Sequence, residues 1–263
     1  MSGAAPPPIE AARSPREDRY ARVVDAVIPA LDEEAAIGAV LDAIPRPAVR
    51  RVVVADNGST DRTAEVARAH GALVVTEPRR GYGSACLRAI EALRGEPPEA
   101  VLFLDADGSD DPAQATELLE PIAAGRADLV IGSRALGGAD PGALTPTQRF
   151  GNWLATRLLR LCYGVRYTDL GPFRAIRWDA LEALGMRDRD FGWTVEMQVK
   201  AARRGLRHEE VPVRYRKRVG RSKISGTVSG SVRAGWKILG TIAWDRVAGG
   251  RRGSARPQGG RPP

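Results

Sequence analysis

The amino-acid sequence predicts an α/β fold in which a mostly parallel sheet is flanked by helices. Three observations support this prediction. Short β-branched runs alternate with Ala- and Glu-rich stretches, the runs are apolar throughout, and the alternation continues from about residue 23 to residue 135. Strands that are apolar on both faces are typical of parallel sheets covered by helices on both sides. Strand–helix repetition of this length is connected by right-handed crossovers.

Each element follows from its local composition. The runs interpreted as strands are 23–28, 52–55, 73–76, 101–104 and 129–131. The stretches interpreted as helices between them lie near 34–43, 61–70, 83–94 and 113–124. After about residue 140 the pattern changes to longer helices near 147–162, 193–204 and 228–247, with one short strand near 211–215.

The two ends of the chain differ from this pattern. Residues 1–20 are rich in Pro and mixed charges, and residues 249–263 consist mostly of Gly, Pro and Arg. Both are predicted to be disordered, because they have too little apolar surface to bury. One domain is therefore expected over residues 21–248.

Composition excludes several classes of protein. No apolar run approaches the roughly 20 residues that cross a bilayer, and the N-terminus lacks the apolar core of a signal peptide. The expected location is the cytoplasm. The two cysteines, Cys86 and Cys162, and the two histidines, His70 and His208, are too few for a disulfide scaffold or a His-based metal centre.

The positive charge of the chain is local. Residues 200–223 contain ten Lys or Arg and two Glu, which equals the net charge of +8 of the whole chain. This concentration indicates an anionic ligand or surface near that segment. A nucleic-acid-binding module would explain the pI of about 10.1, but aromatic residues make up only 5% and are not interleaved with the basic run. No nucleic-acid partner is expected.

Polar or glycine-containing clusters follow all five expected strands. They are Pro29–Glu34, Asp56–Asp61, Arg79–Ser84, Asp105–Asp107 and Gly132–Arg134. Open α/β sheets bind their ligands outside the carboxyl ends of the strands. These clusters are therefore the candidate functional residues.

The cluster after the fourth strand has the composition of a metal site. Residues two apart in an extended chain point the same way, so Asp105 and Asp107 can face one site. Paired carboxylates suit Mg²⁺ or Mn²⁺ held together with phosphate oxygens of a ligand. The alternative is a polar strand end in which Asp110 or Asp111, before Pro112, caps the next helix.

Two other clusters favour nucleotide chemistry less specifically. Asp56 ends a buried strand, where a carboxylate could contact a base, although Gly58 and Ser59 are explained by a turn and a helix cap. Gly81 begins a glycine-rich stretch that fails the dinucleotide fingerprint, because Cys86 takes the place of the third glycine. The small residues at this helix start can still neighbour a phosphate, and no Walker-A sequence occurs.

Taken in order, these clusters resemble the motifs of family 2 glycosyltransferases, which have the GT-A fold. Residues 169–174, 192–197 and 218–223 are similar to the branch that contains dolichol-phosphate mannosyltransferases and other polyprenyl-phosphate glycosyltransferases. The resemblance covers roughly residues 23–245. It implies an inverting, metal-dependent hexosyltransferase that uses a UDP- or GDP-sugar. The change of pattern near residue 140 divides the domain into a nucleotide-sugar half at 21–135 and an acceptor half at 136–248.

The resemblance also implies roles for individual residues. The nucleotide-sugar site would contain Pro29, Leu31, Glu33, Asp56, Gly81, Asp105 and Ala106. Asp105 and Asp107 would hold Mg²⁺ or Mn²⁺ on the diphosphate. The phosphates of donor or acceptor would be gathered by Arg134, Arg149, Arg218, Arg221 and Lys223. The catalytic candidates are Asp107, Arg134, Asp169 and Glu196.

The acceptor decides whether a general base is needed. A hydroxyl must lose a proton, which Asp169 or Glu196 could accept, whereas a polyprenyl phosphate is already anionic and needs a basic cradle. The basic residues 218–223 favour the lipid phosphate, used at the membrane surface alone or with a membrane subunit. A hydroxyl acceptor is the alternative, and a sugar nucleotidyltransferase is a minor one.

The last expected helix bears on membrane contact. Val232, Trp236, Leu239 and Ala243 follow a helical spacing beside basic residues. Core packing is the favoured interpretation. A basic amphipathic helix that touches an anionic bilayer is the alternative.

Overall fold

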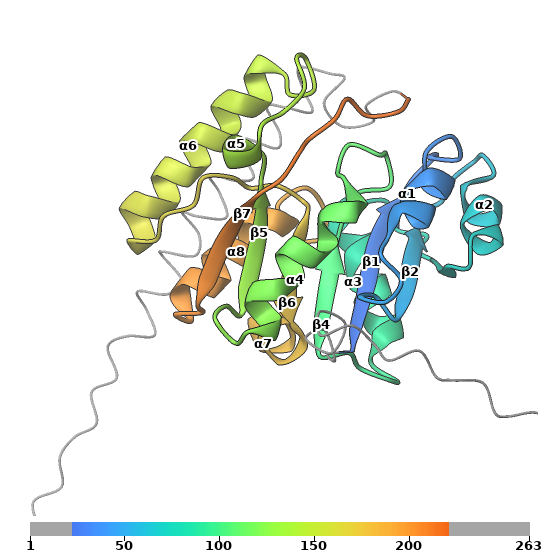
Figure 1. The fold of residues 1–263 in the computed structure, drawn as a ribbon, viewed down its shortest axis with the longest axis horizontal. Coiled ribbons are helices and arrows are strands. Elements are labelled where there is room, and N and C mark those ends of the chain that lie inside the picture. Colours follow the sequence, from blue (N-terminus) through green and yellow to red (C-terminus); the bar gives the residue numbers. More distant parts are fainter. Residues whose placement is uncertain (1–22, 221–263) are drawn as a thin grey trace, which may run out of the picture.

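The computed structural model describes residues 23–220, which build a seven-stranded sheet in the order β3-β2-β1-β4-β6-β5-β7 (Figure 1). The strands are β1 (Val24–Ala30), β2 (Arg51–Asp56), β3 (Leu73–Thr76), β4 (Ala100–Phe103), β5 (Leu129–Ser133), β6 (Arg174–Arg177) and β7 (His208–Pro212). Among these strands of the described residues, only β6 runs antiparallel to its neighbours, β4 and β5. The prediction of a mostly parallel sheet is confirmed.

Most of the helices between these strands agree with the expected ranges to within a few residues at each end, whereas Arg134–Gly137 and Trp178–Leu184 were not expected. The helices are α1 (Ile37–Ala43), α2 (Thr63–Ala69), α3 (Tyr82–Leu93), the 3₁₀ helix η2 (Pro112–Gln114), α4 (Ala115–Ala123), α5 (Arg134–Gly137), α6 (Pro146–Tyr163), α7 (Trp178–Leu184) and α8 (Trp193–Arg203). Within residues 23–220, none of the helices combines the length and apolar character needed to cross a membrane.

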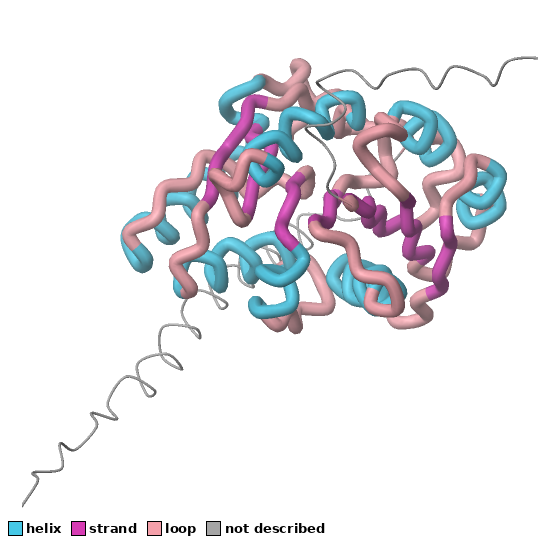
Figure 2. The backbone as a smooth tube through the Cα atoms, turned by 60° about the horizontal axis from the view of Figure 1, so that its bottom comes forward, coloured by secondary structure: helices cyan, strands magenta, loops and turns pink. Residues whose placement is uncertain are grey.

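Helices cover both faces of the sheet, as Figure 2 shows. One buried cluster joins the strands to α1, α2 and α4. A second joins the other face to α3, α6, α7 and α8. Successive residues of β1 serve the two clusters, with Ala26 and Ile28 in the first and Val27 in the second. Burial on both faces explains why the strands β1, β2, β4 and β5 are mostly apolar.

After residue 140 the structure differs from the prediction at two points. Strand β6 and helix α7 were not predicted, and β6 was missed because it begins and ends with arginine. Arg174 is nonetheless fully buried, since its guanidinium donates to the carbonyl oxygens of Leu170, Gly171 and Thr194. The last strand is His208–Pro212 rather than 211–215. It lies at the edge of the sheet, where polar residues are tolerated. The expected helix 228–247 and both expected disordered ends lie outside the described residues.

Candidate active site

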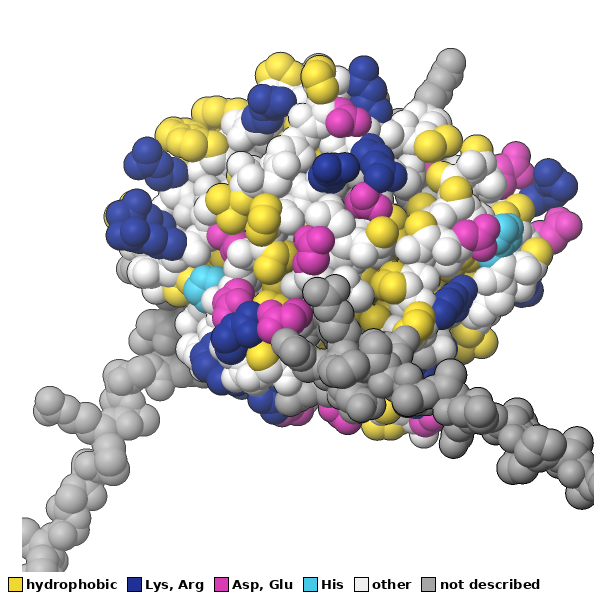
Figure 3. All heavy atoms as spheres, in the orientation of Figure 1, with side chains coloured by type: hydrophobic (Ala, Val, Ile, Leu, Met, Phe, Trp, Pro, Cys, Tyr) yellow, Lys and Arg dark blue, Asp and Glu magenta, His cyan; other side chains and the backbone are white. Residues whose placement is uncertain are grey.

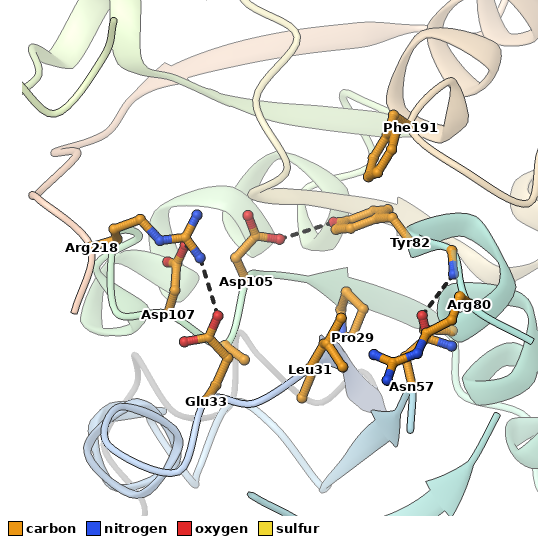
Figure 4. A pocket seen from close by; sticks show the side chains of 14 residues that line it. Pro29, Leu31, Glu33, Asn57, Arg80, Tyr82, Asp105, Asp107, Phe191 and Arg218 are labelled. Carbon is orange, nitrogen blue, oxygen red and sulfur yellow. Dashed lines mark hydrogen bonds and ion pairs between the residues drawn. The ribbon is translucent and has the colours of Figure 1, made fainter. Parts of the chain in front are cut away.

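A pocket lies where β1, β2 and β4 end, and it encloses about 240 Å³ (Figure 4). Its lining residues are Pro29, Ala30, Leu31, Glu33, Asn57, Arg80, Gly81, Tyr82, Ala85, Asp105, Ala106, Asp107, Phe191 and Arg218. The sequence predicts eight of them, namely Pro29, Leu31, Glu33, Gly81, Asp105, Ala106, Asp107 and Arg218. The carboxyl edge of the parallel strands therefore assembles most of the candidate residues in one hollow.

The two carboxylates after β4 both face this pocket. Asp105 accepts a hydrogen bond from the hydroxyl of Tyr82 at 3.1 Å. Asp107 accepts one from the backbone N–H of Ser109 at 2.9 Å and pairs with the guanidinium of Arg218 at 3.0 Å. Nearby, Asp110 accepts a hydrogen bond from the backbone N–H of Asp105 at 3.2 Å. Three acidic side chains are thus crowded into six residues.

This crowding changes the acidity of the carboxyl groups. Burial, followed by the charges of Asp107 and Asp110, raises the pKa of Asp105 well above its ordinary value. Burial also raises the pKa of Asp110 to about 7, although the hydrogen bond from the Asp105 amide acts in the opposite direction. A cation in the pocket would favour the charged forms of both groups.

The segment after β7 brings a positive charge to the same place. The backbone N–H of Arg216 donates to the carbonyl of Ser109 at 2.8 Å, and that of Val219 donates to the carbonyl of Asp107 at 2.9 Å. These bonds hold the segment across the loop after β4. Arg218 consequently reaches both Glu33, at 3.1 Å, and Asp107 (Figure 4).

The loop before α8 forms the opposite wall of the pocket and supplies Phe191. It lies so close to α3 that a Cβ at Gly83 would stand 2.1 Å from the carbonyl oxygen of Asp188, and one at Gly81 would stand 2.1 Å from that of Arg189. The backbone N–H of Ser84 donates to the same Arg189 oxygen at 2.9 Å. The glycines after β3 thus permit close packing of two backbone segments, whereas the glycines of a dinucleotide fingerprint allow close approach to a pyrophosphate.

Four lining residues with large side chains had no role assigned from the sequence: Asn57, Arg80 and Tyr82, which lie within the predicted clusters, and Phe191, which lies outside them. Asn57 donates to the carbonyls of Glu77 and Arg79 and accepts from the N–H of Gly81 at 2.8 Å. It therefore ties the loop after β2 to the loop after β3. Its position beside Asp56, at the end of a buried strand, was the available signal. No sequence pattern marks Phe191, because it reaches the pocket only through the packing of its own loop against α3.

Several predicted residues do not line the pocket. Asp56 is buried at the end of β2 and accepts from the N–H of Ser59 at 3.1 Å. Arg149 is exposed on α6. Arg221 and Lys223 lie outside the described residues. The predicted site is therefore only partly assembled within residues 23–220.

The two proposed general bases are engaged elsewhere. Asp169 is buried and pairs with Arg134, whose Nη2 and Nε lie 2.6 and 2.8 Å from its carboxylate oxygens. Glu196 accepts from the backbone N–H groups of Arg187 and Asp188 and pairs with Lys200 at 2.7 Å. It holds the start of the loop that carries Phe191. Neither carboxylate opens into the pocket.

The residues present fit a divalent cation that also binds a ligand. Asp105 and Asp107 line the pocket, and Oδ1 of the buried Asp110 has no hydrogen-bond partner among the described residues. Over residues 23–220, no three Asp, Glu, His or Cys side chains form a complete metal cluster. A cation here would take its remaining oxygen ligands from a bound diphosphate and water, as Mg²⁺ commonly does.

Comparison with known proteins places this geometry in a family. Residues 25–185 match the family Glycosyl transferase family 2. An uncharacterized glycosyltransferase of Mycobacterium tuberculosis is 41% identical over 221 residues, which cover 82% of this chain and 97% of that protein. A dolichyl-phosphate hexose transferase of Haloferax volcanii is 33% identical over 202 residues, which cover 76% of this chain and 86% of that protein.

Among solved structures, the chain resembles glucosyl-3-phosphoglycerate synthase from Mycobacterium tuberculosis, determined with Mn²⁺, UDP-glucose and phosphoglyceric acid. The TM-score is 0.70 at 23% identity, and the match covers 88% of this chain and 82% of that one. This likeness confirms the predicted GT-A fold. Together with the sequence matches, it shows that the chain is an enzyme of the glycosyltransferase class and belongs to glycosyl transferase family 2.

Proposed function

We propose that this glycosyltransferase moves a hexose from a nucleoside diphosphate sugar to a polyprenyl phosphate. One observation carries the choice of acceptor: the two candidate general bases, Asp169 and Glu196, are both bound by other groups and lie outside the pocket. A phosphate monoester is already ionised and needs no base. The dolichyl-phosphate hexose transferase among the relatives supports the same acceptor class.

The pocket walls suit the donor. Pro29 and Leu31 offer apolar contact to a nucleoside, and Arg80 and Asn57 lie on the side where β2 and β3 end. Asp56, one residue before Asn57, stays a candidate for the base contact. The diphosphate would lie toward Asp105 and Asp107, because these carboxylates can hold Mg²⁺ or Mn²⁺ against it. Such a cation neutralises the charge that develops on the departing diphosphate.

The reaction then requires an anionic nucleophile on the opposite side of the sugar. An oxygen of the acceptor phosphate forms a bond to the anomeric carbon while the bond to the diphosphate oxygen breaks, which inverts the configuration. Arg218 would attract that phosphate, since arginine pairs with phosphate oxygens through its planar fork. Arg134, Arg149, Arg221 and Lys223 are further candidates for this cradle.

A hydroxyl acceptor is the second candidate, and one observation favours it. Glu33 and Asp107 line the pocket and are paired there with Arg218. If Arg218 moved away, either carboxylate could accept a proton from a hydroxyl. This route therefore requires the basic segment to leave the site, whereas the lipid-phosphate route uses it in place.

The two acceptors are separated by one assay of the full chain. UDP- and GDP-sugars with a labelled hexose are supplied with Mn²⁺ and either a short polyprenyl phosphate or a panel of soluble alcohols, including phosphoglyceric acid. We expect label only in the lipid phosphate. Transfer to a soluble hydroxyl, with none to the lipid phosphate, would contradict the proposal. A thermal-shift panel of the same donors identifies which nucleotide binds.

A further inference from the structure

Helix α6 presents an unusual surface outside the active site. In the part of the chain that the structure describes, four large hydrophobic side chains are more than half exposed, and three of them lie on α6: Phe150 at 60%, Trp153 at 51% and Leu161 at 79%. The fourth, Leu136, lies on α5, which directly precedes α6. Isolated exposed hydrophobic residues are normal, but a cluster marks an interaction site.

These side chains share one face of the helix with basic residues. The 3.6-residue period places Phe150, Trp153 and Leu161 on the same side as Arg149, Arg157 and Arg160. The rings of Phe150 and Trp153 lie 5.8 Å apart, and the Arg157 guanidinium lies 5.5 Å from the Trp153 ring. The opposite face packs into the protein through Ala155 and Leu159. We name the six residues on the outer side the α6 face.

The charge of the α6 face has one sign. None of the 18 residues of α6 is acidic. Figure 3 shows basic and hydrophobic side chains gathered at the edge of the molecule where Figure 1 places α6. A helix whose outer side mixes arginine with Trp, Phe and Leu is typical of helices that lie in the interface of an anionic membrane.

We propose that the α6 face docks on the surface of an anionic lipid bilayer. Charge complementarity selects this occupant. A second copy of the chain would bring like charges together in a symmetric contact. Residues 221–263 contain nine Arg or Lys and one Asp, so their net charge also opposes packing against the arginines of the α6 face. Docking would hold the enzyme at the surface where a lipid-linked acceptor lies, and α6 would bind the bilayer in the same way if the acceptor were a different molecule.

Vesicle binding tests this surface without donor or acceptor. The full chain is floated with vesicles of phosphatidylcholine and phosphatidylglycerol in equal amounts, and with pure phosphatidylcholine. We expect binding to the anionic vesicles only. The variant Phe150→Ser/Trp153→Ser/Leu161→Ser and the variant Arg157→Glu/Arg160→Glu should each bind at least about tenfold more weakly, because both the apolar and the electrostatic contributions drive such binding. Leu73→Ser, which removes an exposed leucine from β3, is the matched control and should bind normally.

Fluorescence locates the contact. The fluorescence of Trp153 is obtained as the difference between the emission of the wild type and that of Trp153→Phe. Brominated lipids should quench this fluorescence when vesicles are present, and soluble acrylamide should quench it when they are absent. Unchanged vesicle binding by both α6 variants would overturn the proposal. The proposal would also be overturned if acrylamide did not quench Trp153, because the chain itself would then cover α6. A dimer that dissociates when the three serine substitutions are made would overturn it as well, because a second copy would then be the occupant. A thermal-shift response to donor in each variant shows that it is folded, so loss of vesicle binding is not loss of structure.

Discussion

Residues 23–133 and residues 134–220 contribute strands to one sheet but differ in whether their buried acidic groups reach the pocket. In the first region, Asp105 and Asp107 point into the pocket. In the second region, Asp169, Arg174 and Glu196 are buried and form hydrogen bonds with backbone groups or with other side chains. The first region supplies most groups that can meet a donor, and the second positions the loop that forms the far wall.

This difference shows that burial of a charged residue is not by itself a sign of catalysis. Arg174 illustrates the point, because burial lowers the pKa of its guanidinium to about 10 while three carbonyl oxygens accept its hydrogen bonds. A buried charge of this kind must be fully paired to be tolerated. Its purpose is to fix the turn between residues 170 and 174 against α8.

The largest expected effect follows from removing a carboxylate of the first region. Asp107→Asn should lower metal-dependent transfer on the order of 10³-fold, because a group that stabilises charge in the transition state is lost. The rate of sugar transfer measured with saturating donor checks this. Asp140→Asn alters an exposed carboxylate and should leave the rate unchanged. Equal rates for the two variants would place the catalytic charge elsewhere.

The contact between the two regions should break when Gly83 gains a side chain. Gly83→Ala places a Cβ against the backbone of Asp188, so the loop with Phe191 must move. We expect a loss of about 1–3 kcal/mol of unfolding free energy, typical of overpacking, together with weaker donor binding. Chemical denaturation and donor titration measure both. Gly95→Ala, where nothing lies within 4 Å of the new Cβ, should be neutral.

A substitution at Glu196 tests whether this residue of the second region is structural or catalytic. Glu196→Gln should cost about 1–3 kcal/mol of stability, because a buried charged acceptor of two backbone N–H groups is lost. At a temperature where the variant is folded, kcat should stay close to wild type. A general base would instead cost roughly 10²–10⁴-fold in kcat. A loss of that size, with stability unchanged, would restore the hydroxyl-acceptor hypothesis.

The last prediction concerns the alkylation rates of two cysteines, one from each region. Burial is the main cause that raises the pKa of the Cys86 thiol on α3 well above its usual value. Its thiolate, the reactive form, should therefore be scarce near pH 8 and form only at higher pH. Cys162 on α6 is half-buried. Alkylation followed by mass spectrometry should label Cys162 first, and equal labelling rates would mean that the core around α3 opens readily.

The sequence predicted the first region better than the second for a physical reason. Parallel strands buried on both faces produce unbroken apolar runs, and their ends mark one edge of the sheet, so Pro29, Asp105 and Asp107 could be placed before any contact was known. The antiparallel β6 begins with a buried arginine whose partners are distant carbonyls, and no local pattern reveals it. The position of Phe191 in the pocket wall depends on how closely its loop approaches Gly81 and Gly83, which lie more than 100 residues earlier in the chain.

Asp105 and Asp107 should bind a divalent cation together with the diphosphate of a donor sugar. The decisive experiment is calorimetric titration of the matching nucleoside diphosphate sugar into the full chain, with and without Mn²⁺. We expect Mn²⁺ to tighten donor binding at least about tenfold, or roughly 1.4 kcal/mol, and Asp107→Asn to abolish this gain. The same affinity with and without Mn²⁺, or a gain that survives in Asp107→Asn, would mean that these carboxylates do not hold the cation.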